Sequence, residues 1–257
     1  MRAPEKFVDW LSQHEHVDRK FGYIYQYHPR SDAHSIALCT FLVEDLLEES
    51  ELLRAQAKKG EIAYAINVEH RWPNGKKKTI DLAIGEPNGP SIQGIKMTGI
   101  GVTNSFKQVL ISCEAKAVMT EHKKSQPRVF DELSSSHEIV HQGSPEAIAA
   151  GITIVNIGSS FASPLRQTTA GSLVVTKHRQ PGVAESMISH LRALPIRDRV
   201  GQVGFDAYCT VVVESDNQTI ARLWTDPPAP QPGSPDHYST FVKRITKFYA
   251  ERFAVLP

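Results

Sequence analysis

The segment from Val109 to Lys116 constrains the fold of this chain more than any other. Its apolar part, Val109-Leu110-Ile111-Ser112-Cys113, is suited to a buried strand, and it closes in Glu114-Ala115-Lys116. Strand side chains alternate between two faces, so Ser112, Glu114 and Lys116 share one of them. A carboxylate and an ammonium group are costly to bury without partners. We therefore expect the charged end of this strand to have partners or a function.

A second short apolar strand carries a single acid, Asp81, within the run Thr79-Ile80-Asp81-Leu82-Ala83-Ile84. The sequence Pro73-Asn74-Gly75-Lys76 indicates a turn before it, because Asn-Gly accepts positive φ. This turn joins Lys77–Ile84 to the alternating segment Glu61–Arg71. We predict a hairpin of these two strands, the first of which places four apolar residues on one face: Ile62, Tyr64, Ile66 and Val68.

Helical segments flank these strands. Ser31-Asp32 offers cap chemistry before a helix from Ala33 to about Glu49. A helix from about Ser125 or Pro127 to His141 follows the strand 109–116, and Pro127 suits its first turn. Ala150–Ile157 is apolar and without charge, which is typical of a strand covered on both faces. The remaining expected elements are a helix containing Phe7, Trp10 and Leu11, a surface excursion over 85–101, a helix over 183–194, a hairpin of 206–214 and 219–224, a Pro-rich strap over 226–235 and a helix over 237–253.

This order of elements predicts an α/β sandwich with a mixed β-sheet. The 257 residues are enough for one large domain with additions, and 40% hydrophobic and 22% charged residues are ordinary for a soluble globular protein. The formal net charge of +1 neither demands nor excludes a nucleic-acid partner. Local clustering of the charges decides that question.

Cysteine usage and the N-terminus bear on the compartment. Cys39, Cys113 and Cys209 are far apart and form no C-x-x-C pair, which argues against structural zinc and against a disulfide framework. Residues 1–7 lack the apolar core of a signal peptide, and no apolar run approaches the length needed to cross a bilayer. We expect a cytoplasmic protein with buried free thiols and no membrane contact.

Asp81 and the Glu114-Ala115-Lys116 segment together carry the chemistry of metal-assisted phosphodiester hydrolysis. Two carboxylates on adjacent strands, with the backbone carbonyl of Ala115, can hold Mg²⁺, which keeps several waters on an incomplete protein cage. Lys116 would orient or activate the attacking water and stabilise charge on the phosphorane. The alternative interpretation is a Glu–Lys pair at a strand end with an acid near a turn, which contributes little energetically.

Ile80-Asp81 followed by Glu114-Ala115-Lys116 resembles the motif of the PD-(D/E)xK nuclease superfamily, which includes many type II restriction endonucleases. The resemblance covers a core of about residues 33–157, with additions over about 158–257, and departs at Ile80, where the family often has Pro. It implies one nuclease domain with a restriction-endonuclease-like αβα sandwich. It also implies Mg²⁺, replaceable by Mn²⁺, held by Asp81, Glu114 and the Ala115 carbonyl, with Asp81, Glu114 and Lys116 as catalytic residues.

The implied function is a divalent-metal-dependent DNA endonuclease, with a type II restriction enzyme acting as a homodimer as the leading subclass. A defence DNase switched on by a cyclic nucleotide is an alternative within the same chemistry. A non-catalytic nucleic-acid-binding or assembly protein on the same fold is an alternative from another class. Cutting of DNA that depends on metal and on Lys116 separates the enzyme from the binding protein.

Several further residues are weaker candidates. Glu69 on the hairpin or Glu44 on the first long helix could add a metal ligand, although solvated acids are at least as good an explanation. Cations that could follow a DNA backbone are Lys123, Lys124 and Arg128 at the start of a helix and Lys77 on the hairpin. A solvated charged turn explains these cations equally well.

Overall fold

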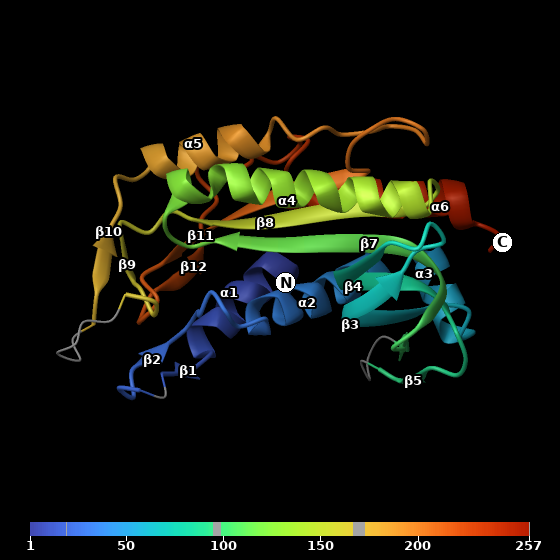
Figure 1. Cartoon of the computed structure of the whole chain (residues 1–257), viewed down its shortest axis with the longest axis horizontal. Coiled ribbons are helices and arrows are strands. Elements are labelled where there is room, and N and C mark those ends of the chain that lie inside the picture. Colours follow the sequence, from blue (N-terminus) through green and yellow to red (C-terminus); the bar gives the residue numbers. More distant parts are fainter. Residues whose placement is uncertain (19, 95–98, 167–172, 257) are drawn as a thin grey trace.

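The hairpin predicted over residues 61–84 forms two neighbouring strands of the central sheet. In the computed structural model, which describes residues 1–18, 20–94, 99–166 and 173–256, eight strands form this sheet in the order β12-β11-β8-β7-β4-β3-β6-β5 (Figure 1). The elements are α1 (Ala3–Gln13), β1 (His16–Val17), β2 (Ile24–Tyr25), α2 (Ala33–Glu49), α3 (Glu51–Lys58), β3 (Ala63–Arg71), β4 (Lys77–Pro87), β5 (Ile92–Gln93), β6 (Gly101–Val102), β7 (Phe106–Val118), α4 (His122–Gly143), β8 (Ile148–Asn156), β9 (Ser160–Ala162), β10 (Val175–Lys177), α5 (Gly182–Leu191), β11 (Ala207–Ser215), β12 (Ala221–Leu223) and α6 (Tyr238–Phe253).

The sheet is mixed because the chain changes connection at β7. β3, β4 and β7 pair antiparallel, and Gly75 has φ +82° in the turn between β3 and β4. β7, β8 and β11 pair parallel, with α4 crossing from β7 to β8 and α5 from β8 to β11. The predicted α/β class with a mixed central sheet is confirmed. Every residue of β8 is buried, as its charge-free sequence requires.

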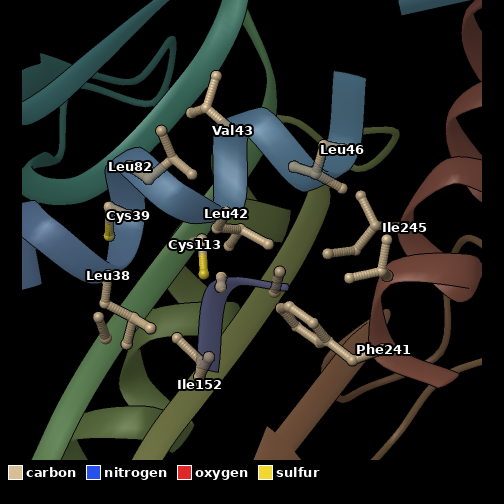
Figure 2. Packing of buried hydrophobic residues seen from close by; sticks show 14 of the residues in the cluster. Leu38, Cys39, Leu42, Val43, Leu46, Leu82, Cys113, Ile152, Phe241 and Ile245 are labelled. Carbon is tan, nitrogen blue, oxygen red and sulfur yellow. The ribbon is translucent and has the colours of Figure 1, made fainter. Parts of the chain in front are cut away.

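Helices cover both faces of the sheet. α4 and α5 lie over one face, where Leu133 and Ile188 belong to one hydrophobic cluster. α1, α2 and α6 cover the other face, and α6 brings the end of the chain into the same core as α2. Figure 2 shows Leu42 of α2 close to Cys113 of β7, with Phe241 and Ile245 of α6 in the same cluster. The three cysteines are free and buried, as predicted.

The alternation of β3 fails at Asn67, so the prediction that Val68 shares a face with Ile62, Tyr64 and Ile66 is wrong. Asn67 has φ +53°, a left-handed conformation. The side chains after it therefore lie on the opposite face of the sheet from the one that regular alternation predicts. Val68 packs with the α4–α5 cluster, whereas Ile66 packs with the α2 cluster. The Asn67 amide donates to the Asp32 carboxylate at 2.9 Å, and the Asp32 side chain makes no cap hydrogen bond to α2.

Two other predicted boundaries are corrected. α4 begins at His122, earlier than Ser125 or Pro127, and Pro127 therefore lies inside the helix and not in its first turn. The predicted surface excursion over 85–101 contributes short strands to the sheet edge, since β4 extends to Pro87 and β5 and β6 follow. Residues 95–98 of that excursion lie outside the described residues. No helix in the described part of the chain is both long and apolar enough to cross a membrane.

Asp206, just before β11, joins four elements through a fully buried carboxylate. It accepts hydrogen bonds from Arg197 at 2.9 Å, Arg252 at 2.6 Å, His141 at 3.1 Å and the Ala149 backbone at 2.8 Å. Burial opposes its ionisation, but the hydrogen bonds from the three side chains outweigh burial and lower the pKa of Asp206 to about 2. This cluster ties α4, β8 and α6 to the loop that follows α5.

Asp206→Asn should lower the free energy of unfolding by about 3–5 kcal/mol, because it leaves the buried guanidinium of Arg197 without its counter-charge. Denaturant titration at pH 7 measures this loss. The folded pKa lies below the ordinary value of 3.8, so the carboxylate's contribution is present at neutral pH and disappears as the pH falls from about 3.8 to about 2.

Glu214→Gln is the control for this prediction, since Glu214 pairs with Arg222, whose side chain is 66% exposed. The control should cost about 0–1 kcal/mol. Equal losses in the two variants would contradict a structural role specific to Asp206.

Candidate active site

The candidate site forms where β4 and β7 separate. Their antiparallel ladder ends at the pair Leu82–Cys113, and Asp81 and Glu114 are the next residues on each strand. Ile80 packs in the α4–α5 cluster and Leu82 in the α2 cluster, so the strand turns over at Asp81. The Asp81 carboxylate accepts the Ala115 backbone N–H at 2.7 Å. The Asp81 side chain thus accepts the hydrogen bond that a backbone carbonyl of β4 would accept in a regular ladder.

Glu114 is the most densely paired acid of the site. It is 6% exposed and contacts Lys116 at 2.7 Å, Lys78 at 2.9 Å and the hydroxyl of Ser136 at 3.1 Å. Burial alone would raise the pKa of Glu114, but the charges and hydrogen bonds of Lys116 and Lys78 outweigh it, and the pKa is lowered. Glu114 therefore stays ionised inside the fold.

Asp81 has the opposite balance. Burial, and next the nearby negative charge of Glu114, raise the pKa of Asp81 to about 6, although the Ala115 N–H and the two lysines oppose the shift. Two acids in one site with their pKa values displaced in opposite directions are typical of functional centres. A divalent cation bound between the two acids would stabilise the ionised form of both carboxyl groups.

Lys116 lies between two acids. Its ammonium is 2.7 Å from Glu114 and 3.3 Å from Glu132 of α4. Burial would lower the pKa of Lys116, but the charge of Glu114 and then of its other neighbours raises it above the ordinary value. Lys116 is therefore a protonated hydrogen-bond donor at neutral pH.

The oxygen atoms present suit a hard cation on an incomplete cage. Asp81 and Glu114 supply carboxylates at neighbouring positions, and Ala115 directs its carbonyl to the same strand edge as its N–H, toward Asp81. Mg²⁺ is commonly held by one or two carboxylates and retains waters. Within the described ranges no group of three or more His, Cys, Asp or Glu side chains is arranged to hold a metal ion. The set therefore fits Mg²⁺ better than a metal that needs a full protein cage.

The two accessory acids lie apart from this site. Glu69 forms an exposed ion pair with Lys77 at 2.7 Å, and Glu44 pairs with Lys6 of α1 at 2.8 Å, on the face opposite α4. Each of these acids is paired with a lysine away from Asp81 and Glu114, so the ion pairs do not support the prediction that either adds a metal ligand. Lys77 is thereby engaged with Glu69.

The predicted DNA-binding cations lie near the site to different degrees. Lys123 and Lys124 are exposed on the first turn of α4. Arg128, one to two turns further along, is exposed and pairs with Glu132 at 2.9 Å, which links it through that acid to Lys116.

Sequence reasoning missed three residues that contact the site: Lys78, Glu132 and Ser136. Arg128, Glu132 and Ser136 are spaced i, i+4 and i+8, which places them on one face of a helix, and this spacing was the available signal. Lys78 gave no comparable signal. Regular alternation from Asp81 puts Lys78 on the opposite face, and only the irregularity at Asp81 brings the two together.

Comparisons of the chain with family models, with curated proteins and with solved structures gave no match. The function must therefore be inferred from the geometry of the site itself.

Addition of Mn²⁺ at about 100 times its Kd should stabilise the wild-type protein by about 2.7 kcal/mol, since only the folded state assembles the two carboxylates. Thermal unfolding with and without the metal measures this. Asp81→Asn should abolish the metal-induced shift, and Glu69→Gln should leave it intact. A shift of equal size in Asp81→Asn would place the metal elsewhere.

Proposed function

We propose that this chain is a divalent-metal-dependent endonuclease that hydrolyses DNA phosphodiester bonds. The observation that carries the proposal is the meeting of Asp81, Glu114 and Lys116 at the point where β4 and β7 separate. These are the three residues whose spacing resembles the PD-(D/E)xK motif, and they come from the two strands that the motif requires. The order of elements over residues 33–157 supports the same interpretation.

In this proposal Asp81, Glu114 and the Ala115 carbonyl hold Mg²⁺, or Mn²⁺ in its place. The ion, when bound, neutralises the scissile phosphate and lowers the pKa of a coordinated water. Glu114 is buried and Asp81 is partly buried, so their charges act through a medium that screens them less than bulk water does.

Lys116 supplies the hydrogen bonds of the reaction. Its raised pKa keeps it protonated at neutral pH, so it donates to the attacking water and to the phosphorane oxygens and does not accept the water's proton. Lys78, on the other side of Glu114, offers a second positive charge to the same phosphate. A type II restriction enzyme, acting as a homodimer on a palindromic site, is the subclass that the motif favours.

Lys116→Ala should reduce the rate of plasmid cleavage in Mg²⁺ by about 10²–10³-fold, the cost of removing one transition-state donor. Agarose electrophoresis of supercoiled, nicked and linear plasmid over time measures the rate. EDTA should stop cleavage by the wild-type protein, and Glu44→Gln should leave it unchanged.

A matched pair of neighbouring lysines tests the role of Lys78. Lys78→Ala should slow cleavage by about tenfold or more, whereas Lys77→Ala should not, because Lys77 is exposed and pairs with Glu69. Plasmids of many sequences that stay intact with wild-type protein and Mg²⁺, with and without candidate cyclic-nucleotide activators, would instead favour the non-catalytic binding protein.

A further inference from the structure

A pocket of about 390 Å³ opens directly beside Lys116. Its floor is the last part of β7, from Ala115 to Val118, and continues into residues 119–121. α4 forms one side of the pocket, and the segments around Tyr27 and Phe161 form the other. The volume lies within the range of about 300–1,000 Å³ that is usual for small-molecule sites. Lys116 lines this pocket and also forms the ion pair with Glu114 described above.

One side of the pocket is made of rings. Tyr27 packs against His34 with ring centroids 4.8 Å apart and against Phe161 with centroids 6.3 Å apart. Pro29 and Pro164 extend this side toward the rim. Burial lowers the pKa of His34 to about 4, so its ring is neutral at physiological pH. The neutral, partly exposed ring of His34, packed against the buried ring of Tyr27, suits the face of a flat heterocycle.

The opposite side is polar and charged. Arg128 and Lys116 both line it, and Glu132 bridges them, at 2.9 Å from the first and 3.3 Å from the second. Ser125 lines the same side. A phosphate at this side would compete with Glu132 for both cations and would then lie next to Lys116.

The floor offers unpaired backbone groups. Ala115 directs its N–H away from β8 toward Asp81, and residues two apart on a strand direct their N–H and C=O groups to the same edge. Ala117 therefore directs its N–H and C=O to this edge, where β4 no longer pairs with β7 in the described residues. A donor and an acceptor from one residue match the hydrogen-bonding edge of a nucleobase.

We infer that this pocket receives one unpaired nucleotide of DNA adjacent to the scissile phosphate. The base would contact the rings of Tyr27 and His34 and the Ala117 edge, and its phosphate would lie toward Arg128 and Lys116. A base stacked in a regular duplex cannot enter, so the nucleotide must be unpaired and out of the stack when it is bound, either because it was already unpaired or because binding extrudes it from a duplex. This inference rests on the proposed nuclease function and specifies the form of its substrate.

The test compares two labelled duplexes of one sequence, one fully paired and one with a single unpaired nucleotide. Binding is measured by fluorescence anisotropy with Ca²⁺ in place of Mg²⁺, which avoids cleavage. Wild-type protein should bind the duplex with the unpaired nucleotide about tenfold more tightly, the effect of one base on an aromatic surface. Equal affinity for the two duplexes would overturn the inference.

Two serines of α4 supply a matched pair of variants. Ser125 lines the pocket and Ser135 is exposed elsewhere on the helix, and each hydroxyl donates to the carbonyl three residues before it. Ser125→Phe should fill the pocket and remove the preference for the unpaired nucleotide, while Ser135→Phe should keep it. His34→Ala, which removes a half-buried ring, should reduce the preference even if Ser125→Phe fails to fold. Equal effects of the two serine variants would contradict the inference.

The plasmid assay separates this inference from the function on which it rests. Intact plasmid together with a tenfold preference would reject the nuclease and leave the pocket as a DNA-binding site. Metal-dependent cleavage without the preference would retain the nuclease and reject the nucleotide pocket.

Discussion

The hydrogen bond from the Ala115 backbone to the Asp81 carboxylate is the contact on which the candidate site depends. It ends the β4–β7 ladder without leaving a buried N–H unsatisfied, which would otherwise be costly. The same bond fixes Asp81 beside Glu114. Beyond it β4 and β7 no longer pair in the part of the chain that the structure describes, and residues 115–118 of β7 line the pocket beside Lys116. One local departure from regular pairing thus positions the acids and opens the space next to them.

Glu114 belongs to a network in which cations and acids alternate. Lys78 and Lys116 neutralise Glu114, while Glu132 shares Lys116 and Arg128. Buried ion pairs of this kind are weak evidence for stability, because the desolvation of each charge offsets much of the attraction. Removing one partner of such a network is nevertheless costly, because the charge left behind is buried without its counter-charge.

The sequence predicted the longer strands of the central sheet because these depend on local periodicity, but it missed the short edge strands β5 and β6. Asp81, Glu114 and Lys116 lie on strands whose apolar character is evident from the sequence, whereas the register between β4 and β7 is set by their pairing in the fold. Val68 and the position of Pro127 were predicted wrongly, since a left-handed residue at Asn67 and an early start of α4 are set by tertiary contacts. Lys78 was missed for the same reason, because its approach to Glu114 requires the irregular residue at Asp81. The finer identity of the fold remains a prediction from the motif.

The contacts of α6 determine when the chain can fold during its synthesis on the ribosome. Tyr238 of α6 donates to the buried carboxylate of Asp45 at 2.7 Å, and Arg252 of α6 reaches Asp206. Phe241 and Ile245 fill the face of the sheet that α2 also covers (Figure 2). A nascent chain that still holds α6 in the exit tunnel therefore has two buried acids short of a partner and one side of its core open. Native packing of the N-terminal half must therefore wait until α6 has been made and has left the tunnel.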